Sequence, residues 1–335
     1  GLRHLYWDAG GMVANLLAVA EADGLSAAHV FLGFDDALVA RVIGIDGVTE
    51  VPLAIVTLGG SAPDWPEVEP VRLEVEPISP RPIRFPLIDA TQQAGVVDDV
   101  DKWRAAAVDV GEPASRSERP EGESSEAIEE VILRRGSTRM FERVDAPREL
   151  LEWGMAMAAQ PAPADFVGPG RTLLRHFLSV HAVDGVEPGA YRWRSDTREL
   201  ELVHPGDFRA EAELLCLRQP LGGDSAFTAF HCADLDAVLG ALGTRGYRAA
   251  QFEAGIAAGR LSLAAFALGF GATGLTFFDE AVSEFFATSA SCMLVTSVGV
   301  PAYRNAPGGP PGAVTELAGY GRLMERLSLQ LHRSR

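Results

Sequence analysis

Residues Arg245–Phe278 read R-G-Y-R-A-A-Q-F-E-A-G-I-A-A-G-R-L-S-L-A-A-F-A-L-G-F-G-A-T-G-L-T-F-F. From Tyr247 to Leu268 the stretch contains no Pro and is rich in Ala and Leu, which favour helix. Both faces of this helix are nearly apolar, so we expect it to be buried. Gly255 and Gly259 lie one turn apart and form a small-residue strip that another helix or a ligand can approach closely.

Gly269 ends the predicted helix, and G-A-T-G-L follows over Gly271–Leu275. Two interpretations stay open for these residues. In the first, the helix is an ordinary core element with a Gly cap at its C-terminus. In the second, Gly271–Leu275 is a glycine-bounded loop that presents backbone N–H groups to a flat ligand.

Much of this stretch occurs twice in the chain. Shifted upstream by 245 positions it falls on Leu2–Leu32, where Arg3, Ala9, Gly10, Leu16, Ala20, Ala22, Gly24 and Ala27 match Arg248, Ala254, Gly255, Leu261, Ala265, Ala267, Gly269 and Ala272. Both copies then pass through Phe-Asp and a short helix into a predicted strand, Pro52–Gly59 in the first copy and Cys292–Gly299 in the second. Chance similarity of Ala-rich helices is the alternative, but the shared order favours a duplication.

Composition limits the possible partners. Lys and Arg total 29 against 46 acidic residues, a net charge of −17, which argues against nucleic acid or an anionic membrane as a partner. No apolar run reaches the ~20 residues of a membrane span, and no signal peptide opens the sequence. Cys216, Cys232 and Cys292 lack metal-ligand spacing and suit core positions in a reducing cytoplasm. The seven histidines form no metal-binding pair, so we expect no metal site.

The chain is long enough for two hydrophobic cores. We expect residues 1–60 to be the second half of a degenerate domain, because Leu2 already lies inside a helix pattern that has no N-cap. Residues 61–125 are Pro-rich and acidic and predict an extended arm and linker. Residues 126–305 form a complete domain, and 306–335 a C-terminal tail and helix.

Within the arm, Ile83, Phe85, Leu87 and Ile88 are expected to pack on a neighbouring surface, and Val97–Ala107 is expected to be a short helix. In the complete domain, helix and strand signals alternate irregularly, which favours α+β over a doubly wound fold. Helices are expected from Glu126 and at Pro147–Ala159, Glu211–Leu217 and Leu235–Leu242. Strands are expected at Leu173–Ala182, Leu200–Val203 and Ala226–Cys232, and Gly185–Trp193 is expected to be a turn that leads into a further strand.

Arg134–Arg139, R-R-G-S-T-R, is the most concentrated cationic cluster of the chain. Guanidinium forks pair bidentately with phosphate oxygens, and the Ser and Thr hydroxyls add donors. The alternative is a solvated helix C-terminus, where Arg complements the helix dipole. The cluster alone favours neither interpretation.

Taken together, R-R-G-S-T-R-M-F, P-G-A-Y-R-W (Pro188–Trp193), R-G-Y-R-A-A-Q-F-E-A-G and L-G-F-G-A-T-G-L-T-F-F-D resemble the nitroreductase superfamily, specifically its SagB-type peptide dehydrogenase branch. The resemblance implies an α+β fold with a mostly antiparallel sheet flanked by helices. It also implies that two copies pair and bind FMN in the groove between them. A tandem chain would supply both copies as a pseudo-dimer, and a homodimer is the other possibility.

The resemblance assigns roles to individual residues. It implies that the R-x-S-x-R triplet holds the FMN phosphate and ribityl chain, with Arg135, Gly136, Ser137 and Arg139. The backbone N–H groups of the next segment would face the flavin N5 edge, with Thr273, Gly274 and Leu275. Arg304 would be a second phosphate-binding cation, and Pro161–Asp165 would be the loop that one copy lends to the other copy's flavin.

This sequence departs from the family pattern in two places. The first copy has Ala28-His29-Val30 opposite Thr273-Gly274-Leu275 and lacks R-x-S-x-R, so we expect residues 1–60 to hold no flavin of their own. The Lys-Tyr pair of azoline-oxidising members is replaced by Arg245-Gly246-Tyr247-Arg248. Arg cannot accept a proton, which leaves Tyr247 as the candidate catalytic acid or base. Alternatively, Tyr247 and Arg248 anchor the helix start. Glu253 is expected to satisfy an internal Arg.

The resemblance therefore implies an FMN-dependent oxidoreductase that transfers hydride between flavin N5 and an organic substrate or NAD(P)H. A dehydrogenase acting on a peptide or natural-product intermediate is the first expectation. A general nitro or quinone reductase is the second. A third is a non-catalytic scaffold or binding subunit, because the first copy has already lost the flavin motifs.

Overall fold

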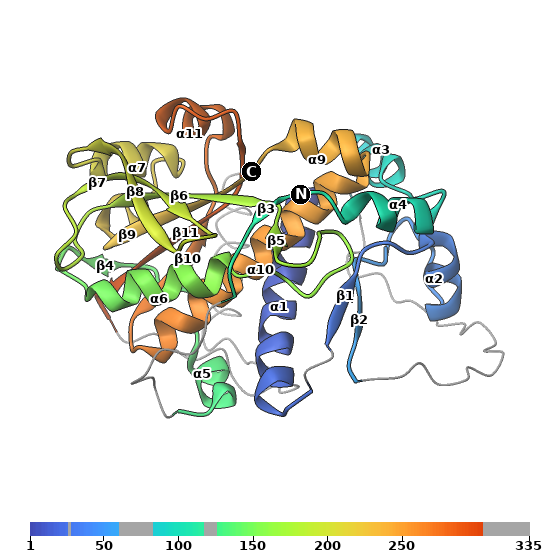
Figure 1. Ribbon diagram of the computed structural model, residues 1–335, viewed down its shortest axis with the longest axis horizontal. Coiled ribbons are helices and arrows are strands. Elements are labelled where there is room, and N and C mark those ends of the chain that lie inside the picture. The colour runs from blue at the N-terminus through green and yellow to red at the C-terminus, as the bar shows by residue number, and fades with distance from the viewer. Residues whose placement is uncertain (26–27, 60–82, 117–125, 304–335) are drawn as a thin grey trace, which may run out of the picture.

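The computed structural model describes residues 1–25, 28–59, 83–116 and 126–303 (Figure 1). Its helices are α1 (Leu2–Ala22), α2 (Asp36–Ile43), α3 (Pro86–Ala94), α4 (Val100–Ala107), α5 (Ile128–Arg134), α6 (Arg148–Ala159), α7 (Arg209–Leu215), α8 (Leu221–Asp224), α9 (Leu235–Leu242), α10 (Arg245–Ala267) and α11 (Asp279–Phe285). Its strands are β1 (His29–Phe31), β2 (Ile55–Thr57), β3 (Glu112–Pro113), β4 (Phe141–Glu142), β5 (Arg171–Thr172), β6 (Leu174–Val180), β7 (Gly189–Arg194), β8 (Glu199–Pro205), β9 (Phe227–Ala233), β10 (Gly271–Leu275) and β11 (Ser291–Pro301).

The main sheet is antiparallel throughout, with strand order β10-β11-β9-β6-β7-β8, and β4 pairs with the end of β11. Helices α6 and α10 lie on one side of this sheet and α7 and α11 on the other (Figure 1). The strands β6, β9 and β11 are almost wholly buried because helices cover both faces. The expected α+β class with a mostly antiparallel, helix-flanked sheet is confirmed.

The two long helices α1 and α10 pack against each other at the centre of the molecule, between the main sheet and the small β1–β2 sheet (Figure 1). Glycine permits this approach. A Cβ on Gly10 would lie 2.3 Å from the carbonyl oxygen of Phe252, and a Cβ on Gly255 would lie 2.6 Å from that of Trp7. The contact is reciprocal, because Phe252 and Gly255 stand 245 positions after Trp7 and Gly10. The predicted small-residue strip is therefore a helix-crossing point.

Both long helices end in the same way. Gly24 and Gly269 adopt the left-handed conformation, with φ of 73° and 83°. The next residue in each copy donates its backbone N–H to a carbonyl five positions earlier, Leu25 to Ala20 at 2.7 Å and Phe270 to Ala265 at 2.8 Å. This is the Schellman arrangement, which favours Gly at the left-handed position.

The two segments also share the order of their elements. The sequence α1-β1-α2-β2 corresponds to α10-β10-α11-β11, and the strands pair antiparallel in both cases. Each long helix sends an arginine to the first residue of the other segment's short helix. Arg3 pairs with Asp279 at 2.8 Å, and Arg248 pairs with Asp36 at 3.1 Å. The two segments are thus related by a reciprocal exchange of contacts.

The arm differs from its expectation. Instead of extended chain, its described part forms α3 and β3, whereas α4 confirms the short helix expected within Val97–Ala107. Pro86 lies in the first turn of α3, where a missing N–H costs nothing. Ile83, Phe85 and Leu87 were expected to pack, but their side chains are 59–79% exposed, so that expectation is wrong for these three.

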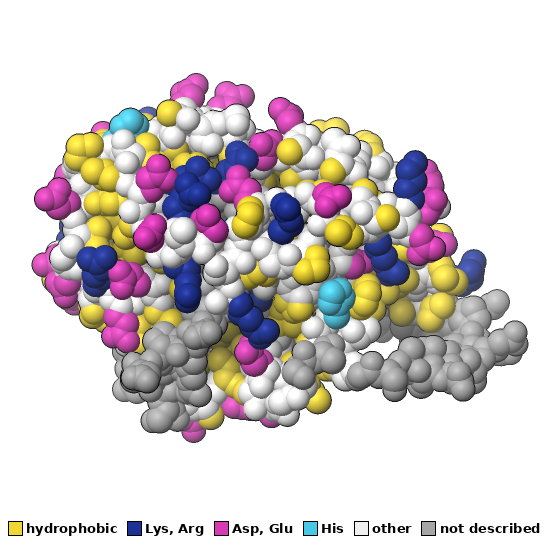
Figure 2. Space-filling view, in the orientation of Figure 1, with side chains coloured by type: hydrophobic (Ala, Val, Ile, Leu, Met, Phe, Trp, Pro, Cys, Tyr) yellow, Lys and Arg dark blue, Asp and Glu magenta, His cyan; other side chains and the backbone are white. Residues whose placement is uncertain are grey.

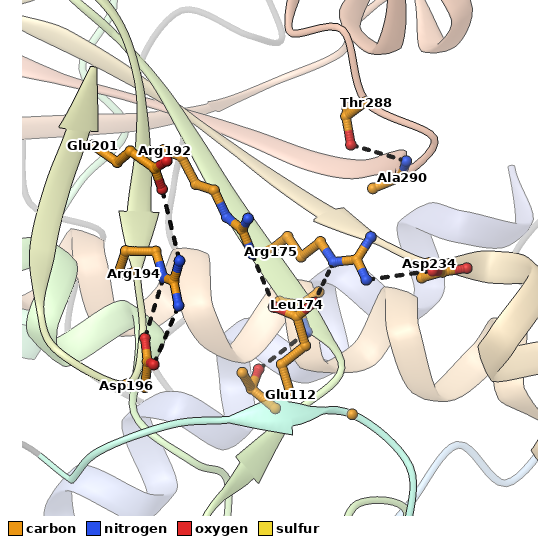
Figure 3. A network of polar contacts seen from close by, with 12 residues as sticks. Glu112, Leu174, Arg175, Arg192, Arg194, Asp196, Glu201, Asp234, Thr288 and Ala290 are labelled. Carbon is orange, nitrogen blue, oxygen red and sulfur yellow. Dashed lines mark hydrogen bonds and ion pairs between the residues drawn. The ribbon is translucent and has the colours of Figure 1, made fainter. Parts of the chain in front are cut away.

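A charged network fastens the end of the arm to the main sheet (Figure 3). Glu112 in β3 accepts from Arg175 in β6 at 2.5 Å and pairs with Arg192 in β7 at 3.3 Å. Arg175 also reaches Asp234, which caps the start of α9. Because β3 also pairs with β5, the arm's C-terminal end is held against β5 as well as the main sheet.

The surface face in Figure 2 carries basic and acidic side chains side by side rather than one broad basic patch. Cys216, Cys232 and Cys292 are free and buried, as expected of small core residues. The described residues contain no cluster of His, Cys, Asp or Glu that could hold a metal ion. None of the helices within the described ranges has both the length and the apolar character needed to cross a bilayer.

Candidate functional site

The arginine-serine segment that follows α5 runs along the edge of β10. Ser137 Oγ and Thr273 Oγ1 are 2.8 Å apart, and Thr138 N donates to Ala272 O at 3.0 Å. Gly271 lies so close to Thr138 that a Cβ there would be 2.3 Å from Oγ1. Two segments separated by more than 130 positions in the sequence are therefore adjacent in the structure.

Gly271–Leu275 is a strand, so the expectation of a loop is wrong. Its five residues pair with β11 from Gly299 to Val295. Backbone groups in an antiparallel edge strand alternate between facing the partner and facing outward. Since Ala272 turns its carbonyl outward to Thr138, the N–H of Gly274 also faces outward. The expected outward donor is therefore present, but an edge strand positions it.

A cavity of about 470 Å³ lies between α1, α10 and β10, and we call it the β10-side cavity. The lining includes Trp7 and Asn15 from α1, Gly274 and Leu275 from β10, and Arg135. Its volume is within the usual range for small-molecule sites. Arg135, Gly274 and Leu275, which come from the two separate motifs, thus face one cavity.

Two buried polar atoms beside this cavity have no partner in the described structure. They are Nε of Arg135, a donor, and Oδ1 of Asn15, an acceptor. Burial lowers the pKa of the Arg135 guanidinium, and no ion pair in the described residues involves it. Unpartnered buried polar atoms are costly, and an anion together with an N–H donor would satisfy both.

Gly274 has an open environment. It is the exposed residue of β10, and the nearest atom to a Cβ built there is Val295 O at 4.0 Å. Packing therefore does not require glycine, and glycine weakens a strand. A side chain at this position would meet nothing in the protein and would occupy space beside the cavity. The absence of a side chain at Gly274 leaves room for a flat ligand that lies against this strand.

The other expected phosphate ligands are placed less completely. The side chain of Arg139 is exposed, and its backbone N–H donates to Tyr303 Oη at 2.9 Å. Gly136 lies between Arg135 and Ser137 outside any helix or strand. Arg304 lies outside the described residues. The roles of all three remain predictions.

Tyr247 lines a different pocket of about 560 Å³, together with Arg3, Leu87 and Leu239. This pocket adjoins the β10-side cavity through Arg3, whose guanidinium lies 5.9 Å from the centre of the Trp7 ring. Arg248 and Arg245 both pair with Asp36, which fits the alternative in which this segment anchors the helix start. A catalytic role for Tyr247 remains a prediction.

Glu253 is fully buried and is not in an ion pair within the described structure. Its two oxygens accept from Thr172 Oγ1 at 2.9 Å and from Leu173 N at 2.8 Å. Burial raises the pKa of Glu253 to about 7, and the nearby charge of Arg260 opposes that rise. Glu253 was expected to pair with an internal Arg, but Arg260 acts on it only through its charge. The groups that donate hydrogen bonds to Glu253 are the Thr172 hydroxyl and the Leu173 amide.

A larger cavity of about 700 Å³ lies on the other side of α1, and we call it the β1-side cavity. Residues 161–165 line it beside His29. The main chain of this segment pairs with β1, with Val30 N donating to Pro163 O at 2.8 Å and Asp165 N to Val30 O at 3.0 Å. Residues 161–165 therefore pair with β1 of the N-terminal segment.

Asn15 was missed by the sequence analysis, although it is a polar residue in the middle of an apolar helix. That pattern alone does not distinguish a cavity-lining residue from one that faces solvent. Only the packing of α1 on α10 places Asn15 beside Arg135 in one cavity.

No protein-family model matches the sequence, and no curated protein matches it. Among solved structures, the chain is similar to a candidate nitroreductase from Anabaena variabilis, with a TM-score of 0.66 and 22% sequence identity. The overlap covers 89% of this chain and 65% of that protein, so the chain spans less than two thirds of its length. At this identity the likeness shows the fold: the chain has a nitroreductase-like α+β fold.

Two further structures overlap less well. NfrA1 nitroreductase from B. subtilis gives a TM-score of 0.40 at 19% identity over 58% of this chain and 73% of that one. A chain of the E. coli microcin synthetase McbBCD complex gives 0.40 at 18% identity over 55% of this chain and 77% of that one. At these scores neither overlap carries an argument about function.

Proposed function

We propose that the chain is an FMN-dependent oxidoreductase and that the β10-side cavity is its flavin site. The observation that carries the proposal is the convergence of Arg135 and Gly274 on one cavity. The nitroreductase-like fold supports it independently. When bound, FMN would supply a ring that exchanges hydride with organic molecules at N5.

The protein's own groups have distinct tasks in this proposal. Arg135, which is half-buried and has no ion pair among the described residues, would bind the phosphate, and the Ser137 hydroxyl would add a donor. The outward N–H of Gly274 would stabilise negative charge on the ring edge. Asn15 Oδ1 would accept a hydrogen bond from a ring N–H. Trp7 and Leu275 would exclude water from one side.

The chain would be a tandem pseudo-dimer in which residues 1–60 act as the partner half. The matched caps, the reciprocal Gly10–Gly255 crossing and the exchanged arginine–aspartate pairs support a duplication. The overlap with the Anabaena protein covers 89% of the chain, more than residues 126–305 alone can account for. The N-terminal half would hold no flavin, because His29 stands where the second copy has Gly274.

Within this class, we propose a SagB-type dehydrogenase that acts on a peptide or natural-product intermediate. The motif set at Arg134–Phe141 and Arg245–Gly255 supports this reading. Tyr247 would be its proton-handling group, but it lines the adjoining pocket, and that position favours the second candidate, an NAD(P)H-dependent nitro or quinone reductase. Reduction of the bound flavin by NADH or NADPH under anaerobic conditions would identify the reductase.

The test is flavin binding by the full chain. Purified protein incubated with FMN should retain visible flavin absorbance after gel filtration, with one FMN per chain. Arg135→Gln should lower the affinity for FMN by about 100-fold, because a charge-assisted contact to phosphate is lost. Arg143→Gln is the matched control, since this exposed arginine pairs with Asp224 on the surface. Protein that does not bind FMN would leave the scaffold as the remaining interpretation.

A further inference from the structure

The β1-side cavity has features that its flavin-like counterpart lacks. Its volume of about 700 Å³ suits a small molecule. The apolar part of the lining comprises Leu17 from α1, Leu25 beyond the end of α1, Ala162 from residues 161–165, and Val167. Leu17, Ala162 and Val167 are only 5–9% exposed, so an apolar body would bury mainly the side chain of Leu25, which is 42% exposed.

The acidic groups of this cavity already have partners. Asp165 accepts from Leu32 N at 2.8 Å, from Gly33 N at 3.0 Å and from Arg104 Nε at 3.1 Å. Glu21 pairs with Arg116 at 3.2 Å on the exposed rim. Each of these pairs balances one negative charge with one positive charge.

Of the three arginines that line the cavity, Arg260 is the one that is not in either of these ion pairs. Its Nη1 donates to Gln160 O at 2.7 Å, and it forms no ion pair within the described residues. Burial lowers the pKa of Arg260 to about 10, so the group stays charged at neutral pH. Glu253 lies two turns earlier on α10, but its oxygens are bound by Thr172 and Leu173.

The two cavities occupy corresponding positions but have different linings. In the internal repeat Arg260 corresponds to Asn15, Leu17 to Ser262 and His29 to Gly274. Arg260 makes the β1-side cavity more cationic and Leu17 makes it more apolar, while the His29 ring occupies the position that Gly274 leaves open in the other cavity. Such a lining does not suit a second copy of the ligand in the β10-side cavity.

We propose that the β1-side cavity binds a small apolar molecule with a single carboxylate, held by the guanidinium of Arg260. Glu253 and Glu21 raise the pKa of Arg260 through their charge, but neither is in an ion pair with it among the described residues. A guanidinium without a direct ion-pair partner beside apolar walls suits one negative charge on an apolar body. A guanidinium can hold a carboxylate by two parallel N–H···O bonds, which favours this headgroup. The site is separate from the proposed flavin site, and it does not require that the flavin proposal be correct.

The test uses calorimetric titration of the full chain, with and without added FMN, with hexanoate and with its neutral analogue hexanamide. Hexanoate should saturate one site and bind at least about tenfold more tightly than hexanamide. Arg260→Gln should remove that preference, and Arg260→Lys should keep part of it. Arg116→Gln is the matched control, because this rim arginine already pairs with Glu21, and it should change the hexanoate affinity by less than about threefold.

Location is tested by hydrogen exchange. Hexanoate should slow amide exchange in the non-proline residues of 161–165 and 167–170, which line the cavity, in the parent protein but not in Arg260→Gln. Equal affinity for hexanoate and hexanamide in the parent protein would overturn the proposal, even if Arg260→Gln does not fold. Tighter binding of inorganic phosphate than of hexanoate would overturn it too. The proposal would also be overturned if each chain bound a second FMN and hexanoate displaced it.

Discussion

At the residue scale, Gly274 and Asn15 are unfavourable for the protein alone. Glycine weakens an edge strand, and a buried carbonyl oxygen without a partner carries a desolvation cost. The packing around Gly274 does not require a glycine, and Asn15 Oδ1 accepts no hydrogen bond within the described structure. Local costs of this kind are expected where a site serves a ligand rather than the fold.

Gly274→Val should therefore change stability and flavin binding in opposite directions. Val suits an edge strand, and a Cβ there would meet no atom closer than 4.0 Å, so the apo protein should gain about 1 kcal/mol. The side chain should fill the ligand's space and reduce FMN retention to background. Thermal unfolding of the apo protein and absorbance after gel filtration measure the two effects.

The control for this variant is Gly240→Ala in α9, where a Cβ would also meet nothing within 4 Å. It should stabilise the protein by about 1 kcal/mol through helix propensity and leave FMN retention unchanged. If Gly274→Val retained FMN as well as the control does, Gly274 would have no role in the site.

At the element scale, the α1–α10 crossing should be intolerant of small additions. Gly10→Ala would place a Cβ 2.3 Å from Phe252 O, an atom that cannot move without shifting α10. The variant should lose about 3 kcal/mol or more of unfolding free energy. Gly11→Ala, one residue further along the same helix, would meet no atom within 4 Å and should be neutral or stabilising. Urea unfolding of both variants measures the two effects. A Gly10→Ala midpoint equal to that of the parent protein would contradict the prediction.

The two arginine–aspartate exchanges should differ in strength although they correspond in position. Arg248 and Asp36 are almost buried, whereas Arg3 and Asp279 are one-third to one-half exposed. Arg248→Met should cost about 3 kcal/mol because Asp36 and nearby carbonyls lose a buried donor. Arg3→Met should cost less than about 1 kcal/mol. Equal losses in denaturant unfolding would contradict the asymmetry.

How much of the fold the sequence predicts depends on whether an element's signals are local. Helix α9 has the predicted bounds, and α6 and α10 lie within a residue or two of them, because they combine periodic apolar residues with clear ends. Strand β10 was mistaken for a loop because glycine has low strand propensity, and only pairing with β11 makes it a strand. Helix α3 was missed because Pro was interpreted as a breaker rather than as a first-turn residue.

The same distinction applies to the candidate site. Arg135 and Gly274 could be proposed from their motifs, but their common cavity depends on long-range packing. Asn15 and Arg260 gave no local signal, since one polar residue in an apolar helix is compatible with many environments. Only the crossing of α1 and α10 brings them to opposite cavities.

At the scale of the whole molecule, three buried histidines tie stability to pH. Nδ1 of His176 in β6 lies 2.9 Å from Nδ1 of His231 in β9, in the core of the sheet. Burial lowers the pKa of His176 to about 4 and that of His181 to about 4, and it lowers the pKa of His231 well below its usual value. The native state thus binds fewer protons than the unfolded chain below pH 6.5.

Stability should consequently fall as pH drops from about 6.5 toward 4, by about 2 kcal/mol at pH 5 for each of His176 and His181, and His231 should act in the same direction. Glu253 acts in the opposite direction, since burial raises its pKa to about 7, and acidification removes the cost of its buried charge. The stability gained from Glu253 on acidification offsets about as much free energy as one histidine loses. The net change in the free energy of unfolding is therefore still a decrease. The double variant His176→Asn, His231→Asn should show a smaller drop in urea midpoint between pH 7 and pH 5 than the parent. His204→Asn, on the exposed strand β8, should not. A parent protein whose midpoint rises over this interval would mean that the buried glutamate outweighs the histidines.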